Sequence, residues 1–522
     1  MNYFCSNLSK MGISLVFTRK NVNLFINKTF NQIIYSVMKK IFVFAILISS
    51  LLTAFSQEVP TSSQVGALKL PDTIAQIVAP FEMPKLVKPE FPDRTINIES
   101  VGAQQNKLCT NIIQKAINKL SSKGGGTVVV PAGQWLTGRI ILKSNVNLHL
   151  DKDAELHFSG DIKDCLPVVF TRNEGIELYS LGAFIYANGA TNIALTGQGK
   201  LVGPSRDCEI LKKQMEGVVI EKYISTPVEK RIFDGKDGKP VFLPMFFAPM
   251  NCKNVFVEGV TFEKTLFWNV VPQYCENVII RGITVNSVGI FRSDGIDIDS
   301  SKNILVEYCT LDCGDDCFTL KSGRCEDGLR VNKPSENIII RYCLAKRGGG
   351  SVTCGSETAG MIRNMYVHDC VFDGTKNGIL FKTRRNRGGG GENLYYERIR
   401  LNIPGPAIKW DMLGSSMHVG ELANRLPARS ITPLTPSYKN IFMKDIVIEN
   451  CDKFIRAIGI PETKISNVVI ENCNVSSKAL VEISDVDGFV VKNTQIKTNN
   501  SAMNIAGANN IIWDNVKITT KD

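Results

Sequence analysis

The stretch Asn277-Val278-Ile279-Ile280 recurs in the same form at Asn303-Ile304-Leu305-Val306 and at Asn337-Ile338-Ile339-Ile340. Each copy joins an asparagine to a short run of β-branched and other apolar residues, which is the composition of a buried strand. Neighbouring copies are mostly about 23 to 34 residues apart, the spacing of stacked repeats. The other copies begin at Asn192, Asn254, Asn364, Asn393, Asn440, Asn467 and Asn510. The repeat therefore predicts a solenoid.

The length of the repeat selects the kind of solenoid. The apolar runs are too short for helices, and a coil of about 25 residues accommodates three strands and three turns. Asparagine suits the turns because it tolerates the left-handed conformation and because its amide can hydrogen-bond along a stack. We therefore expect an all-β fold, a single-stranded right-handed parallel β-helix whose coils stack about 4.8 Å apart around aliphatic layers.

Other segments depart from the repeat. Residues 109–120 place apolar side chains on one helical face, which predicts a short N-terminal helix that caps the first coil. Residues 206–240 and 405–436 interrupt the repeats and are expected to be inserted loops. The cysteines recur at matching points of the coils and are expected to be small buried hydrophobes, although Cys313 and Cys317 could also form a disulfide.

The first 56 residues contain no acidic residue and differ from the rest of the chain. Met38-Lys39-Lys40 precedes the apolar run 41–52, and small residues follow, which is the pattern of a secretory signal peptide. The run is short for a membrane span, so a membrane anchor is the less favoured alternative. The chain then divides into an upstream extension (1–37), a signal peptide (38–56), a leader (57–90) and a β-helix domain (91–522). We expect a periplasmic or secreted protein.

Charge and composition narrow the range of partners. The formal charge of +11 falls to about +5 without residues 1–56, which hold six lysines and arginines. A mild positive charge suits a polyanionic substrate. Nucleic acid is not expected as a partner because there is no basic and aromatic stripe, and no later apolar run is long enough for stable membrane insertion. With four histidines and no Cys-x-x-Cys pair, we expect no metal and no other cofactor, and we expect a monomer.

Two acidic stretches lie in segments that otherwise resemble buried strands: Ser293-Asp294-Gly295-Ile296-Asp297-Ile298-Asp299 and Cys313-Gly314-Asp315-Asp316-Cys317. Crowded like charges repel one another and lose hydration, so a fold that needed only stability would place apolar residues there. Paired carboxylates suit acid–base cleavage of a glycosidic bond. A cation site or a solvated turn is the alternative for Asp315 and Asp316. For Asp297 and Asp299 we favour turn capping or support of the site.

Residues 94–520 resemble the polygalacturonase family of glycoside hydrolases, family 28, in its bacterial form. The resemblance rests on residues 124–133, Phe267-Trp268, residues 293–297, Gly314-Asp315-Asp316, Gly355-Ser356-Glu357 and Phe381-Lys382. It implies a right-handed parallel β-helix that cleaves galacturonide linkages in pectin by an inverting mechanism without a metal.

The resemblance also implies roles for three aspartates. Asp315 is the general acid, and Asp294 and Asp316 hold and deprotonate the attacking water. Two close anions would raise the pKa of Asp315 and keep it protonated near neutral pH. Inversion needs room for a water molecule, so the acid and base carboxyls are expected to be about 6.5–9.5 Å apart.

Three positions depart from the family pattern. Arg292 replaces an asparagine, Gly349 a histidine and Leu380 an arginine. The lost histidine places endo-polygalacturonase activity in doubt. His418 is a weak candidate to replace it.

A set of basic and aromatic residues is expected to bind the substrate. Lys382 keeps the lysine of the family motif and would pair with a sugar carboxylate. Arg384 and Arg385 would add carboxylate contacts, because guanidinium groups bind carboxylates in a bidentate way. Arg292 and Trp268 complete the set, and Trp268 could equally pack in the core.

The sequence therefore predicts an exported inverting glycoside hydrolase that cleaves galacturonic-acid-containing bonds in pectic polysaccharides or oligosaccharides. Exo action follows if the inserted loops block one end of the substrate groove. A rhamnogalacturonan hydrolase or rhamnohydrolase of the same family is the alternative within this class. Two alternatives of other classes stay open, a non-catalytic pectin-binding β-helix and a calcium-dependent pectate lyase.

Overall fold

A computed structural model describes residues 58–215 and 220–520. The expected upstream extension (1–37) and signal peptide (38–56) lie outside the described residues. Within the part that the structure describes, every helix is too short or too polar to cross a membrane.

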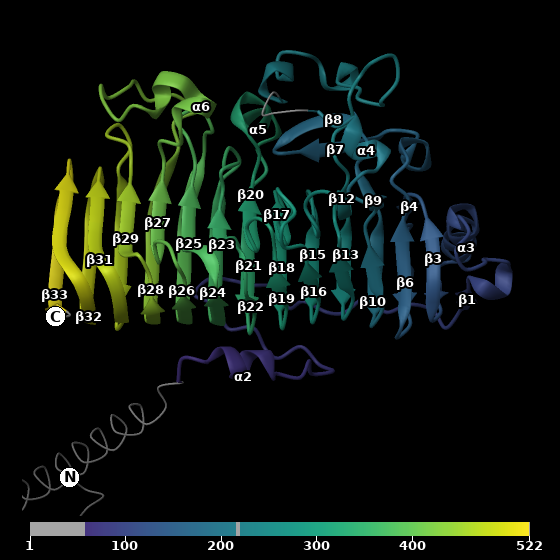
Figure 1. Ribbon diagram of the computed structural model, residues 1–522, viewed down its shortest axis with the longest axis horizontal. Coiled ribbons are helices and arrows are strands. Elements are labelled where there is room, and N and C mark those ends of the chain that lie inside the picture. Colours follow the sequence, from purple (N-terminus) through teal and green to yellow (C-terminus); the bar gives the residue numbers. More distant parts are fainter. Residues whose placement is uncertain (1–57, 216–219, 521–522) are drawn as a thin grey trace, which may run out of the picture. The chain divides into compact units, whose positions relative to one another are not determined.

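Strands of successive coils pair in parallel and form the right-handed parallel β-helix that the repeat predicts (Figure 1). Each coil contributes strands to three faces. The Asn face, which carries the repeated asparagines, contains β1 (Thr95–Asn97), β2 (Gly126–Val130), β5 (Val146–Leu150), β10 (Thr191–Gly197), β13 (Lys253–Glu258), β15 (Glu276–Arg281), β18 (Lys302–Glu307), β21 (Ser335–Arg341), β24 (Ile362–Asp373), β26 (Gly390–Asn402), β28 (Ser437–Asn450), β30 (Ile465–Glu471), β32 (Val486–Ala506) and β33 (Asn509–Thr520).

The other two faces follow each Asn-face strand in turn. The short face contains β3 (Gly133–Thr137), β6 (Ala154–Phe158), β11 (Lys200–Val202), β14 (Thr261–Glu263), β16 (Thr284–Asn286), β19 (Thr310–Asp312) and β22 (Leu344–Ala345), together with the later halves of β24, β26 and β28 and the first half of β31 (Asn474–Ser484), whose second half continues on the site face. The site face contains β4 (Ile140–Ile141), β9 (Ala183–Asn188), β12 (Met245–Met250), β17 (Ile296–Asp299), β20 (Phe318–Lys321), β23 (Gly348–Cys354), β25 (Thr375–Lys382), β27 (Ile408–Asp411) and β29 (Lys453–Ile458).

The repeated asparagines form a continuous ladder of amide hydrogen bonds. Asn277 Nδ2 donates to Asn254 Oδ1 at 3.1 Å, and Asn303 Nδ2 donates to Asn277 Oδ1 at the same distance. Equivalent bonds extend the ladder down to Asn145 and up to Asn467. The backbone is left-handed at these positions, with φ of 59° at Asn277. Both reasons for expecting asparagine in the turns are confirmed.

The interior is filled by apolar side chains that stack from coil to coil. Val278, Ile304 and Ile338 occupy the same position in three adjacent coils and are fully buried. The repeated cysteines are buried among such layers, as predicted. Cys313 and Cys317 are not joined by a disulfide.

The predicted N-terminal helix is α3 (Thr110–Ser122). Its buried side chains are Ile113, Ala116, Ile117 and Leu120, and it packs against β2, β4 and β5. Ile112 is only partly buried. The helix therefore caps the first coil, as expected.

Excursions of the chain leave the site-face strands and lie along one edge of that face, at the top of Figure 1. They hold the antiparallel hairpin of β7 (Val169–Asn173) and β8 (Ile176–Ser180), the helices α4 (Glu209–Lys212), α5 (Cys325–Val331) and α6 (Ser416–Val419), and short 3₁₀ turns. The insertion expected at 206–240 is present. The boundary expected at 405 is wrong, because Ile408–Asp411 is β27 and the excursion begins after it.

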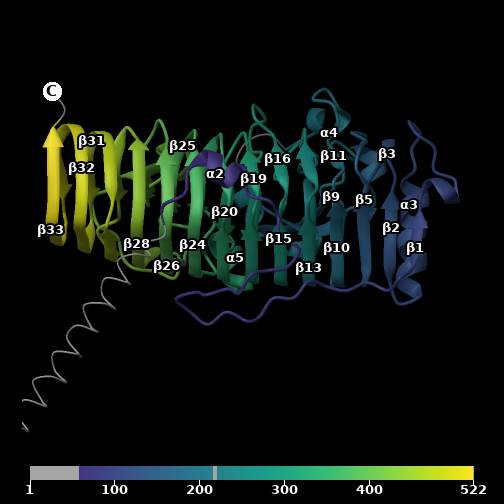
Figure 2. The ribbon, with the colours of Figure 1, turned by 90° about the horizontal axis from the view of Figure 1, so that it is seen from below.

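An extended strap, residues 59–94, takes up most of the predicted leader (57–90); it runs over the short face and then over the Asn face, drawn in purple in Figure 2. It includes α2 (Ser62–Gly66). Arg400 donates to the carbonyl oxygens of Val59 and Pro60. Further along, Arg281 donates to the carbonyl oxygen of Pro71. The strap therefore contacts coils that are far apart in the stack.

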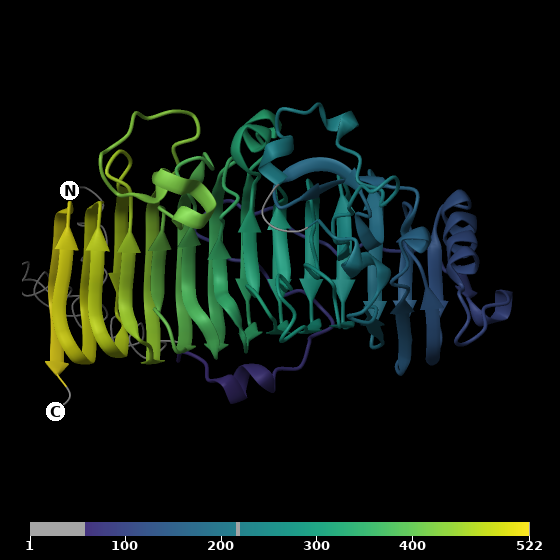
Figure 3. The same cartoon turned by 45° about the horizontal axis from the view of Figure 1, so that its top comes forward.

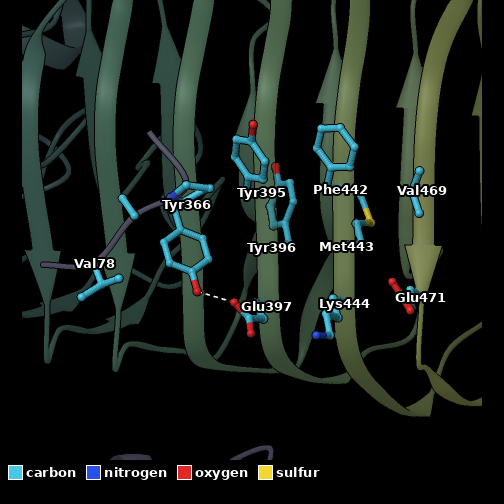
Figure 4. A pocket seen from close by; sticks show the side chains of 12 residues that line it. Val78, Tyr366, Tyr395, Tyr396, Glu397, Phe442, Met443, Lys444, Val469 and Glu471 are labelled. Carbon is cyan, nitrogen blue, oxygen red and sulfur yellow. Dashed lines mark hydrogen bonds between the residues drawn. The ribbon is translucent and has the colours of Figure 1, made fainter. Parts of the chain in front are cut away.

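Apolar side chains of the strap cover an outward-facing apolar row on the Asn face. The covered residues are Ala194, Phe256, Ile279, Leu305, Ile339 and Tyr366, and the strap side chains include Ile74, Ile77, Phe81, Leu86 and Phe91. Beside Val78, a groove of about 450 Å³ remains, lined in part by Tyr395, Phe442 and Val469 (Figure 4). This groove belongs to the Asn face and not to the site face.

Candidate active site

Three aspartates lie together at the start of two paired strands of the site face. Asp294 precedes β17, whereas Asp315 and Asp316 precede β20, which pairs with β17 in parallel. One carboxylate oxygen from each lies within 4.8 Å of the other two. Asp294 and Asp316 are buried, whereas Asp315 is half-buried and reaches solvent. The structure thus brings together the three aspartates that the sequence singled out.

The separation of about 6.5–9.5 Å was expected between whole acid and base carboxyl groups, whereas the distance that the structure gives joins single carboxylate oxygens. They lie within 4.8 Å of one another. A water molecule still fits between two of them, because two O–H···O hydrogen bonds of about 2.8 Å span up to about 5.6 Å. These oxygens come close because consecutive coils stack closely and place Asp294 beside Asp316.

Two lysines compensate part of this negative charge. Lys321 Nζ lies 3.8 Å from Asp294 Oδ2 and 3.2 Å from Glu357 Oε2. Lys382 Nζ donates to Asp316 Oδ2 at 2.6 Å. Although burial opposes it, the carboxylates around Lys321 raise the pKa of its ammonium group well above the usual value, so Lys321 stays charged.

Two of the three aspartates, Asp294 and Asp315, favour protonation. Burial and the nearby charges of Asp297 and Asp315 raise the pKa of Asp294 well above its usual value. Burial and the adjacent Asp316 raise the pKa of Asp315. Because these groups interact strongly, they titrate as a set, and the site retains at least part of a proton above the pH at which an isolated carboxyl loses it.

Asp297 and Asp299 form ion pairs with basic residues next to the trio. Asp297 Oδ1 lies 3.5 Å from Lys321 Nζ, and burial raises the pKa of Asp297 to about 7. Arg172 Nη1 donates to Asp299 Oδ1 at 2.9 Å, and both side chains are fully buried. Of the two interpretations given for these residues, support of the site fits their positions better than turn capping.

Gly349 makes room for the carboxylates. A Cβ atom at this position would lie 2.8 Å from Asp316 Oδ1 and 2.9 Å from Asp315 Oδ1. The two carboxyl groups therefore pack directly against the backbone where the family pattern has a histidine. His418 has Arg384, Arg387, Arg324 and Glu221 as the charged groups that act on it.

Arg292 and Trp268 lie beside the cluster, but both already have partners. Arg292 forms an ion pair with Glu174, at the tip of the β7–β8 hairpin, and its guanidinium lies 4.8 Å from the centroid of the Phe267 ring. Trp268 is buried, stacks on Phe267 at 4.7 Å, and has Lys321 Nζ 4.5 Å from its ring centroid. Trp268 thus packs in the core and supports Lys321.

The two arginines after β25 have different surroundings. Arg385 is buried, donates to Glu462 at 2.5 and 3.1 Å, and also donates to backbone oxygens of the 412–436 excursion. All of its N–H groups are used, so the expectation that Arg385 binds substrate is not retained. Arg384 is half-buried and forms no ion pair with the described residues.

Sequence reasoning missed the network that surrounds the trio. Glu357 lies in a motif that we quoted, but no role was assigned to it, and Lys321 lies four residues after the stretch that ends at Cys317. Arg324 contacts Glu357 at 2.7 Å and Glu174 at 3.4 Å. The alternation of inward and outward residues could have indicated Lys321. It occupies an outward position of β20 and pairs with Asp299 of the acidic strand β17.

Comparisons with known proteins agree with this fold. Residues 127–408, more than half of the chain, match the model of glycosyl hydrolases family 28. A probable polygalacturonase of Vitis vinifera is 27% identical over 411 residues, 76% of this chain and 77% of the relative. An exo-poly-alpha-D-galacturonosidase of Dickeya chrysanthemi is 22% identical, and the match spans 82% of this chain and 75% of the relative.

A solved structure extends the likeness to three dimensions. The hyperthermoactive exopolygalacturonase of Thermotoga maritima superposes with a TM-score of 0.68 at 30% identity, over 81% of this chain and 94% of that one. The residues that match the family model, 127–408, include the coils that hold Asp294, Asp315 and Asp316. The chain therefore belongs to glycosyl hydrolases family 28.

Proposed function

We propose that this glycoside hydrolase cleaves galacturonic-acid-containing bonds in pectic polysaccharides or oligosaccharides, with inversion at the anomeric carbon. The cluster of Asp294, Asp315 and Asp316, with lysines on two sides, is the observation that carries the proposal. The names of the similar proteins, polygalacturonase and exopolygalacturonase, support the substrate class.

Asp315 acts as the general acid. It is the most exposed of the three carboxyls, and its raised pKa keeps a proton that can pass to the leaving glycosidic oxygen. Asp294 and Asp316 hold a water molecule between them. As the water oxygen attacks the anomeric carbon, one of these carboxylates takes its proton, and Lys382 Nζ donates a hydrogen bond to Asp316.

Lys382 also contacts the substrate. Its side chain is one-third exposed, so the ammonium group that binds Asp316 can meet a sugar carboxylate as well. Arg292 is partly exposed, lies two residues before Asp294 in the chain and pairs with Glu174.

We further propose exo action. Excursions that carry α4, α5 and α6 lie along the edge of the site face (Figure 3), where they limit how far a polysaccharide can extend. Two of the similar proteins are named as exo-acting. Residues 38–56 lead us to propose export, which fractionation of expressing cells would test.

Product analysis on polygalacturonate and a panel of defined pectic fragments tests the function. We expect new reducing ends, monogalacturonate as the first product, and the inverted anomer in a time-resolved NMR spectrum. Asp315→Asn should lower the rate by about 10²–10⁴-fold and still fold. Asp312→Asn is the matched control, because Asp312 lies three residues away and pairs with Arg347.

Other outcomes identify the alternatives. Cleavage of rhamnogalacturonan fragments alone would assign the chain to that branch of the family. Binding without any new reducing ends would show a non-catalytic module. Unsaturated products that disappear on addition of a chelator would show a lyase.

A further inference from the structure

The outward apolar row of the Asn face continues beyond the part that the strap covers. The covered cluster reaches as far as Tyr395, whose ring lies 6.3 Å from that of Phe81 in the strap. Four more coils extend the row in register, with Phe442, Val469, Val490 and Ile512. These four lie outside the cluster that the strap covers. Three of them are partly exposed, and Ile512 is 51% exposed. The row is therefore apolar throughout but covered only in part.

A groove marks the place where the strap stops and the uncovered row begins. It has a volume of about 450 Å³ and lies between Val78 and Pro80 of the strap and Phe442 and Val469 of the Asn face (Figure 4). At the other end of the row, Ile512 belongs to β33, the last described strand. The uncovered row thus has a recess at one end and an exposed apolar side chain at the other.

A second row of side chains runs beside the first and alternates in charge. It lies two residues further along each strand and consists of Lys444, Glu471, Lys492 and Asp514, which pair in register. Lys492 Nζ lies 3.2 Å from Glu471 Oε2. Lys444 and Asp514 are exposed and form no ion pair with the described residues. Along the stack the signs are therefore positive, negative, positive and negative.

An alternating row of four charges is complementary to its own reverse. A second copy that is rotated by half a turn about an axis parallel to the strands presents the same face with its stack reversed, and each side chain keeps its position along the strand. Lys444 then faces the partner's Asp514, and Glu471 faces the partner's Lys492. Every charge of the row meets an opposite charge, at two symmetric places each.

The apolar row follows the same symmetry. Val469 faces the partner's Val490 at the centre, and Phe442 faces the partner's Ile512 at each end. The groove beside Val78 leaves space for that isoleucine. Because the stacks run in opposite directions, the strap of each copy lies beyond β33 of the other and does not obstruct the contact.

We propose that this uncovered row binds the same row of a second copy of the chain, with the two stacks antiparallel. Complementarity of the row to itself, in charge and in apolar contacts, selects a copy over an unrelated protein. Four coils span only about 19 Å of the stack, so each copy buries less than the about 800 Å² of a standard interface. The dimer is therefore reversible, with a Kd on the order of 10–100 µM. The monomer expected from the sequence is its dilute form.

Sedimentation velocity of the purified protein from about 1 µM to about 500 µM tests the association. The wild type should pass from monomer to dimer over this range. Val490→Glu should raise the Kd by at least about 100-fold, because it brings two like charges into the apolar centre of the contact. Val490 is partly exposed, and an unchanged thermal unfolding curve of the monomer would show that the variant folds.

A charge exchange tests the antiparallel arrangement. Lys444→Glu and Asp514→Lys should each raise the Kd by about tenfold, because each places like charges opposite one another at two places. An equimolar mixture of the two variants should associate as tightly as the wild type, since the exchanged charges then face each other across the contact. Lys115→Glu makes the same change of charge at an exposed position of α3 and should leave the Kd unchanged.

Three outcomes would overturn the proposal. A protein that stays monomeric over the whole range would leave the row to another occupant, such as upstream residues of this chain or a different protein. A dimer that does not respond to Val490→Glu forms through another face. A mixture of the two charge variants that associates no more tightly than either variant alone excludes the antiparallel pairing.

Discussion

The site face and the Asn face are built by the same coils and yet treat their outward side chains in opposite ways. On the Asn face, outward residues such as Ile279, Leu305 and Ile339 are apolar and are buried under the strap. On the site face, Asp297 and Lys321 are equally buried but charged. Both oxygens of Asp297 lack a hydrogen-bond partner among the described residues. The contrast shows which face was shaped for stability and which for chemistry.

Lys321→Met should have the largest effect on the charged site face. The substitution leaves Asp294, Asp297 and Glu357 buried without their shared cation, so we expect a loss of about 3–5 kcal/mol in the free energy of unfolding. Activity should fall with it, because the charge of Lys321 lowers the pKa of Asp294 and its loss disfavours the carboxylate form further. Denaturant unfolding and kcat/KM measure both effects.

Lys439→Met is the control for that experiment. Lys439 is half-exposed and pairs with Glu392 on the surface, so its loss should change stability by less than about 1 kcal/mol. A Lys321→Met protein as stable and active as the wild type would contradict the role that we give to this lysine.

A pH titration of stability probes the charged face next. Burial raises the pKa of Asp297 from 3.8 to about 7. The folded state therefore holds this proton more tightly, so its stabilising contribution is complete below about pH 4 and is lost as the pH rises to about 7. The change is on the order of 4 kcal/mol. Asp297→Asn should remove this part of the pH dependence, as measured by unfolding free energies between pH 4 and pH 8.

Asp312 provides a comparison of opposite sign. Burial acts against it, but the ion pair with Arg347 lowers the pKa of Asp312 below its usual value. Asp312→Asn should therefore remove stability that the wild type loses as the pH falls. If Asp297→Asn leaves the slope between pH 4 and pH 7 unchanged, the carboxyl does not titrate as described.

The apolar face is tested by Leu86→Ala. Leu86 belongs to the strap, and its side chain is buried against the Asn face. Truncation should therefore cost about 2–4 kcal/mol of unfolding free energy. The activity of the folded protein should be unchanged, because the site lies on another face. Val87→Ala is the control, since Val87 is 66% exposed and its truncation should change stability by less than about 0.5 kcal/mol. A loss of kcat in Leu86→Ala would show that the two faces are coupled.

Gly349→Ala gives the smallest expected effect. The added methyl would push the carboxylates of Asp315 and Asp316 aside, and we expect kcat to fall about tenfold, which equals about 1.4 kcal/mol. Gly66→Ala serves as the comparison, because a Cβ there lies 3.8 Å from Leu344 and far from the site. An unchanged kcat would mean that the carboxylates do not depend on the contact with Gly349.

Sequence predicted the features that depend on local spacing. The asparagine ladder and α3 followed from periodicity, and the aspartate trio followed from two short stretches together with a family resemblance. The destination of Arg385 could not be predicted, because its partner Glu462 lies 77 residues further along the chain. β27 was assigned to a loop because it lacks the leading asparagine and follows Gly405-Pro406.

The strap changes how this repeat protein should unfold. In a simple solenoid each coil contacts only its neighbours, so coils can be lost one at a time from an end. Here a single segment is tied to Arg281, Arg341 and Arg400, on coils that are well separated in the stack. Those coils should consequently open in one cooperative step, and amide hydrogen exchange across them should report a single free energy rather than a gradient.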